Sequence, residues 1–68
     1  MRPAPINDRI VAALALSPMT IRKLSIVLSS STHTLRDRID VMRREGVVEK
    51  CGVEESRGRP WNIYRVAA

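Results

Sequence analysis

The fold of this chain is decided by residues 20–46, which read TIRKLSIVLSSSTHTLRDRIDVMRREG. Apolar residues recur in this segment at the spacing of an amphipathic helix, once before the serine run and once after it. They are Ile21, Leu24 and Leu28, followed by Leu35, Ile39 and Met42. The segment therefore predicts one helix over about residues 21–28 and another over about residues 32–45.

The ends of both predicted helices carry recognisable signals. Thr20 and Ser31 have side-chain oxygens that can accept hydrogen bonds from the first free backbone N–H groups of a helix. Gly46 suits the left-handed conformation that often follows a helix. Only the serines at 29–31 separate the two helices, so the pair matches the helix-turn-helix plan.

The N-terminal side of this segment predicts one more helix. Residues 8–16 have an apolar stripe at helical spacing, Asn7 is a suitable N-cap, and Ser17-Pro18 is a stop signal. Residues 1–5 hold two prolines and are expected to form a short extended arm. The rest, residues 6–68, is expected to be one domain, because 68 residues allow only one small core.

Beyond Gly46 the pattern changes from helix to strand. Residues 47–53 and 60–66 are rich in β-branched and aromatic side chains and predict two strands. Residues 54–59 link them, with Gly58 available for a bend. The predicted fold is therefore α+β, with three helices followed by a two-stranded β-hairpin.

Alternation along the second strand separates two faces. We expect Tyr64 and Val66 to pack on the helices, which leaves Trp61 and Ile63 partly exposed. The opposite facing is the alternative.

The composition favours a polyanionic partner. Twelve Lys and Arg stand against seven Asp and Glu, which gives a net charge of +5, and ten of the twelve cations are Arg. Arginine suits bidentate contact with phosphate or guanine. A solvated basic surface that binds nothing is the alternative.

Other classes of protein find little support. The single cysteine, Cys51, excludes an internal disulfide, and the isolated His33 makes a metal site improbable. No catalytic constellation or phosphate loop is present, so neither an enzyme nor a cofactor is expected. No apolar run approaches the roughly 20 residues of a membrane span, and no signal peptide is evident. A cytoplasmic protein is expected.

The predicted helix at 32–45 presents a mixed face opposite its apolar stripe. Thr32, His33 and Arg36 are the candidates for base contacts from its N-terminal part, and Arg36 suits guanine. Asp37 and Asp40 would repel phosphate there, unless Arg36–Asp40 and Asp40–Arg44 pairs neutralise the charge or an acid accepts a hydrogen bond from cytosine. An ordinary solvated helix face is the alternative.

Further arginines and a lysine suit the DNA backbone and the minor groove. Arg43, together with Arg22 and Lys23 of the preceding helix, would contact phosphates. Residues 57–60 read RGRP, which resembles the core of an AT-hook, a peptide that binds the minor groove. Glu54 and Glu55 dilute the positive charge beside it, so a loop kept soluble by charge is the alternative.

Residues 28–35, 36–48 and 57–66 together resemble the winged helix-turn-helix regulators of bacteria and phages. The resemblance is to the superfamily and covers about residues 6–66. It implies that the helix after the serine cap enters the major groove and that the hairpin, the wing, contacts the minor groove or backbone. By position it selects for these contacts Thr32, His33, Arg36 and Asp37, with Arg57 and Arg59 in the wing.

One residue departs from the family pattern. Ser29 occupies a turn position that is often Gly, where a left-handed conformation would cost a non-glycine residue about 1 kcal/mol. The turn is therefore open to a different construction.

The sequence thus predicts sequence-specific binding of double-stranded DNA by a small, repressor-like transcriptional regulator, with a homodimer as one arrangement and no small-molecule effector evident. Two alternatives remain. One is an architectural DNA binder such as a recombination directionality factor, and the other is a winged-helix module that binds proteins.

Overall fold

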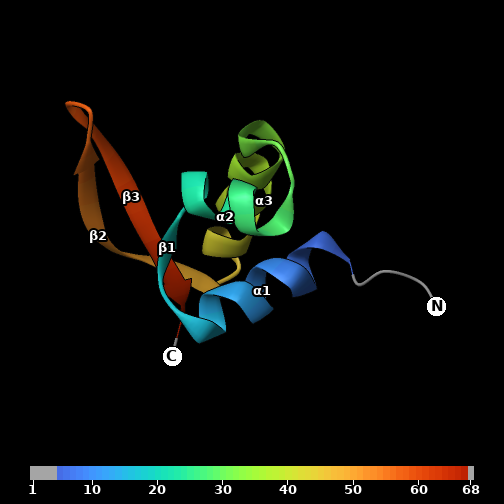
Figure 1. Ribbon diagram of the computed structural model, residues 1–68. Helices are drawn as coiled ribbons and strands as arrows, with labels where there is room; N and C mark the ends of the chain where they lie inside the picture. Colours follow the sequence, from blue (N-terminus) through green and yellow to red (C-terminus); the bar gives the residue numbers. More distant parts are fainter. Residues whose placement is uncertain (1–4, 68) are drawn as a thin grey trace.

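The computed structural model describes residues 5–67, which form three helices and a three-stranded antiparallel sheet (Figure 1). The elements in chain order are α1 (Ile6–Leu16), β1 (Met19–Thr20), α2 (Ile21–Leu28), α3 (Thr32–Arg44), β2 (Val48–Ser56) and β3 (Arg59–Val66). The α+β class is as expected. The expected arm at residues 1–5 lies, apart from Pro5, outside the described residues.

The start of α1 differs from the prediction. The helix begins at Ile6 with Pro5 at its N-cap, so Asn7 lies inside the first turn and does not cap it. The backbone N–H of Arg9 donates to the carbonyl oxygen of Pro5 at 3.1 Å. Proline is well suited to a helix start, because it has no N–H to satisfy and its φ is already close to helical. The predicted stop is correct, since α1 ends at Leu16, directly before Ser17-Pro18.

The predicted Thr20 cap of α2 is confirmed, and the turn after the helix, which the sequence left open, is left-handed at Ser29. The Thr20 side chain accepts a hydrogen bond from the Lys23 N–H at 3.2 Å. Beyond the helix, Ser29 is left-handed with φ 53°, and the Ser30 N–H donates to the Ser25 carbonyl at 3.1 Å. This closing bond is that of a Schellman turn, usually made with glycine. The left-handed turn is therefore kept at a residue with a side chain, and the different construction is not found.

The predictions for α3 are confirmed at both ends and along its stripe. The Ser31 hydroxyl accepts a hydrogen bond from the Thr34 N–H at 3.1 Å. Gly46 has a φ of +78°, and the Val47 N–H donates to the Met42 carbonyl at 2.9 Å. The apolar stripes predicted for α2 and α3 are buried and pack together with side chains of the other elements. The core comprises Ile10, Ala13, Leu14, Ile21, Leu24, Leu28, Leu35, Ile39, Met42, Val48 and Tyr64.

The sheet has one strand more than predicted, because β1 pairs antiparallel with β3 through Met19↔Tyr64 and Thr20↔Ile63. The strand order is β1-β3-β2. Residues 17–20 carry a helix stop and a cap, and two extended residues give no periodic signal of their own. Only the long-range pairing with β3 defines this strand.

The hairpin is longer and its loop tighter than predicted. Ser56 pairs with Arg59, so the link is only Arg57-Gly58 and Glu54 lies within β2. Arg57 and Gly58 both have positive φ, 52° and 75°, as a two-residue type I′ turn requires. The polar residues at 54–56 suggested a loop, but they pair with residues 59–61 in the outer part of the hairpin (Figure 1).

The face prediction for the second strand is confirmed for the burial of its residues, although Trp61 also lines a cavity beside α3 together with Tyr64. Tyr64 is buried and Val66 packs against the core, whereas Trp61 and Ile63 are partly exposed. At the other end of the hairpin, Arg65 Nε donates to Glu49 Oε1 at 2.7 Å. This hydrogen bond, and secondarily the opposite charges, raises the pKa of Arg65 above its ordinary value. Among residues 5–67, none of the helices combines the length and hydrophobicity that crossing a membrane needs.

Candidate nucleic-acid interface

The first turn of α3 presents its predicted site residues to solvent. Thr32, His33, Arg36 and Asp37 are all exposed, because the buried stripe of the helix begins only at Leu35 and faces away from them. His33 Nε2 lies 3.8 Å from Asp37 Oδ2, one helical turn away. Both side chains are largely exposed, so this contact leaves them accessible to a partner.

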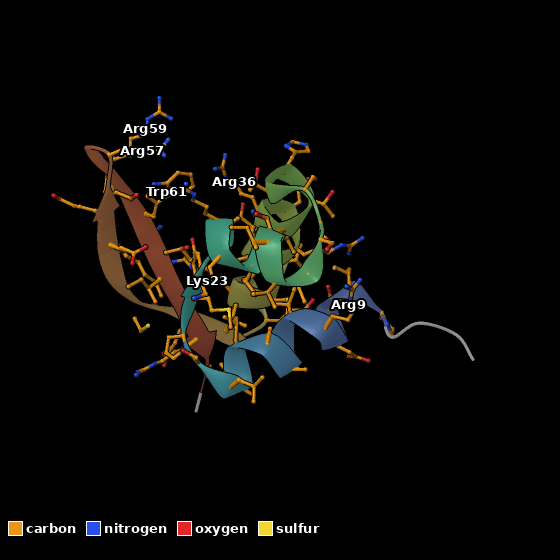
Figure 2. All side chains as sticks on the ribbon, viewed as in Figure 1. Arg9, Lys23, Arg36, Arg57, Arg59 and Trp61 are labelled. Carbon is orange, nitrogen blue, oxygen red and sulfur yellow. The ribbon has the colours of Figure 1, made fainter. Side chains whose placement is uncertain are left out.

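Arg36 lies on the flank of α3 that faces the hairpin. It lines a cavity of about 150 Å³ between α3 and β3, which we name the cleft. The cleft is lined by Ile21, Arg36, Pro60, Trp61, Asn62 and Tyr64. Figure 2 shows Arg36 and Trp61 in the space between the helix and the hairpin.

Arg43 lies on the same flank, but its guanidinium stacks on protein. Its Cζ atom lies 5.6 Å from the centroid of the Tyr64 ring. A cation over an aromatic face is attracted by the ring quadrupole. One face of the Arg43 guanidinium is therefore occupied by the Tyr64 ring. Its other face remains available, since the residue is exposed.

The suggested neutralisation of Asp40 is not found. Among the residues described, the ion pairs within 4.0 Å are His33–Asp37 and Arg65–Glu49, and neither Arg36–Asp40 nor Asp40–Arg44 is formed. The reason is clear for Arg36, which lines the cleft instead of folding back along the helix. Asp40 therefore has no ion-pair partner among the described residues and lies on the exposed face of α3.

The predicted wing residues, Arg57 and Arg59, lie at the far end of the hairpin. Both are exposed, and Figure 2 shows their side chains at its tip. Glu54 and Glu55 lie further down, where they pair across the strands with Trp61 and Pro60. The tip itself is thus basic, and the two glutamates are displaced from it along β2.

The two basic residues of α2 are directed toward the hairpin. Arg22 Nη1 donates to Ser56 Oγ at 3.3 Å, which links α2 to a residue next to the tip. Lys23 lines a shallow hollow with Met19, Glu54 and others. Both residues remain exposed, so they are accessible to a phosphate, but Arg22 is also a structural link between the helix and the hairpin.

Sequence reasoning missed the role of Arg9. From α1, its Nη2 donates to the Leu28 carbonyl oxygen at 2.8 Å, at the end of α2 and directly before the turn into α3. Arg9 lies at the other side of α3 from the hairpin (Figure 2). Nothing in the sequence signals this contact, because an arginine in the first turn of a helix is usually solvated.

Neither protein-family models nor curated protein sequences match this chain. Its function is therefore inferred from the placement of its own residues. Arg36 at the cleft and the two tip arginines lie in the same upper part of the molecule, and Arg9 lies apart from them (Figure 2).

Proposed function

We propose that this chain binds double-stranded DNA as a small winged helix-turn-helix regulator of transcription. In this proposal α2 and α3 form the helix-turn-helix and the β2–β3 hairpin is the wing. The exposed start of α3 lies in the major groove, and the tip arginines, Arg57 and Arg59, contact the adjacent minor groove or its backbone.

One observation carries the proposal. Arg36 on α3 and the tip arginines extend from two separate elements in the same upper part of the molecule, with the cleft between the elements (Figure 2). These three guanidinium groups make no hydrogen bond or ion pair among the described residues. Arg36, Arg57 and Arg59 are therefore unpaired within the described part of the protein. Unpaired arginines on a helix and on a hairpin suit the phosphates and grooves of a duplex.

The helix start suits the major groove for reasons of size and chemistry. A single helix fits the width of this groove, and its N-terminal residues reach base edges first. Thr32 and His33 offer small hydrogen-bonding groups there, and Asp37 can accept from cytosine. We therefore expect binding to depend on sequence.

The first test is the salt dependence of binding. Fluorescence anisotropy with a labelled duplex of random sequence should give an affinity that falls with salt at a log–log slope of about −2.7, if Arg36, Arg57 and Arg59 each neutralise one phosphate. Failure to bind any duplex at low salt would overturn the proposal and leave the protein-binding alternative.

The second test is selection of bound duplexes from a random pool. A regulator should enrich one short motif over the pool. A two-fold repeat of that motif would mean that two copies of the chain bind together. An unchanged pool, despite salt-sensitive binding, would contradict sequence-specific recognition.

A further inference from the structure

The side chains that line the cleft between α3 and β3 suit a phosphodiester group. Arg36 lies on its helix side, and Trp61 and Asn62 lie on its strand side. Trp61 is partly exposed and is the only tryptophan of the chain, so a flat apolar surface is available beside a cation and a polar amide. A DNA backbone presents the matching groups, a charged phosphate next to an apolar deoxyribose face.

We propose that the cleft holds the sugar-phosphate backbone of one DNA strand, and that Arg36 binds a phosphate there instead of reading guanine. The proposal rests on the proposed function, because it assumes a duplex bound by α3 and the hairpin. It names which group of the duplex occupies the cleft.

The geometry of a duplex leads to this assignment. The major and minor grooves are separated by a sugar-phosphate backbone. With α3 in one groove and the tip arginines in the next, that backbone crosses the space between the helix and the hairpin. This space is the cleft. Arg36 lies on the flank of α3 next to it, and not on the side opposite the buried stripe, where base edges would lie.

The neighbouring cations leave this role to Arg36. Arg43 stacks over Tyr64, and Arg22 donates to Ser56. Within the described residues, Arg36 makes no hydrogen bond or ion pair. Arg36 is also the one cation among the residues that line the cleft, and its guanidinium is able to make a charge-assisted, bidentate contact with a phosphate there.

The test combines Arg36→Ala with duplexes in which one phosphate at a time is replaced by an uncharged methylphosphonate. At one position the wild-type chain should lose about tenfold in affinity, whereas the Arg36→Ala chain should lose less than about twofold. Arg36→Ala alone should weaken binding by a similar factor on selected and unrelated duplexes, and should reduce the salt slope by about 0.9.

Arg38→Ala is the matched control. Arg38 is an exposed arginine of the same helix on its other flank, where it lines a hollow with Thr34, Asp37 and Val41. This variant should retain the full methylphosphonate penalty at the position identified with Arg36. Trp61 fluorescence should also change when the wild-type chain binds an unlabelled duplex, because the backbone would lie against the indole.

The outcomes separate the two proposals. If the duplex binds but every methylphosphonate penalty survives Arg36→Ala, or if Arg36→Ala weakens only the selected duplex, the assignment of the cleft is wrong and DNA binding stands. If no duplex binds to the wild-type chain at low salt, both proposals fail.

Discussion

The guanidinium of Arg9 donates a hydrogen bond from Nη2 to the backbone carbonyl oxygen of Leu28, 2.8 Å away and 19 residues along the chain. Leu28 is the last residue of α2, where carbonyl groups have no partner within the helix. A cation at this end is favourable both as a donor and through the helix dipole. α1 is thereby fixed to the end of α2, next to the turn that leads into α3.

Arg9→Ala should lower the free energy of unfolding by about 1 kcal/mol, because the Leu28 carbonyl loses a charged donor in a partly buried position. Urea denaturation followed by circular dichroism measures the effect. Arg38→Ala removes an exposed helical arginine that lacks such a contact, and should change stability by less than about 0.5 kcal/mol. Equal effects of the two substitutions would show that the Arg9–Leu28 bond contributes nothing specific.

Ser29→Gly should stabilise the chain by about 0.5–1 kcal/mol. Ser29 is held at φ 53°, a conformation that strains a residue with a Cβ, whereas glycine adopts it freely at some cost in chain entropy. Thermal and urea unfolding both measure this change. The control is Ser30→Gly, where φ is not positive; glycine there brings an entropy cost and removes the hydroxyl that donates to the Leu28 carbonyl at 3.4 Å, so that stability should fall. A loss of stability in Ser29→Gly would mean that the serine side chain supports the turn.

Arg57→Asn should change stability and DNA affinity in opposite directions. Asparagine followed by Gly58 is a strongly preferred pair in type I′ turns, so the free energy of unfolding should rise by up to about 1 kcal/mol. The same change removes a tip cation, so on the proposed duplex the salt slope should fall by about 0.9. Chemical denaturation measures the stability, and fluorescence anisotropy of the same protein preparation measures the DNA affinity. If the stability rises but the DNA affinity does not change, Arg57 does not contact the duplex.

The double variant Arg57→Ala plus Arg59→Ala should discriminate between flanking sequences. On the proposed duplex it should lose more affinity with A·T-rich flanks than with G·C-rich flanks, since inserted arginines are favoured in a narrow minor groove. The comparison uses duplexes that differ only in the flanks. Arg38→Ala plus Arg44→Ala removes the same charge from α3 and should show no dependence on the flanks. A similar dependence in both variants would contradict a minor-groove role for the tip.

The sequence was sufficient to predict the helix ends and the buried helix stripes, because these depend on residues close together in the chain. Ser31 caps α3 and Gly46 follows it as predicted, because capping depends on residues within one turn of the helix end. The buried stripes were also predictable, since helical spacing places Leu35 and Ile39 on one face whatever they pack against. Asn7 was misplaced because the helix starts at Ile6, with Pro5 at the N-cap position even though it makes no side-chain cap hydrogen bond.

Features that depend on distant residues were not predictable. β1 exists through its pairing with β3, more than 40 residues away along the chain, and the strand character of residues 54–56 depends on their partners in β3. The same holds for the candidate site. The exposed start of α3 followed from its stripe, but the cleft beside Arg36 and the bond from Arg9 to Leu28 required the packing of separate elements.

Thr20 belongs to two structures at once. Its backbone pairs with Ile63 of β3, while its buried side chain caps α2. The hairpin and the helix pair therefore cannot rotate independently about this junction without breaking a sheet pairing or a cap. On the proposed duplex, the separation between α3 and the tip would be fixed before binding. The protein would then favour DNA whose helical repeat and groove widths already match that span, and stiff sequences of the wrong geometry would be rejected without contact to any base.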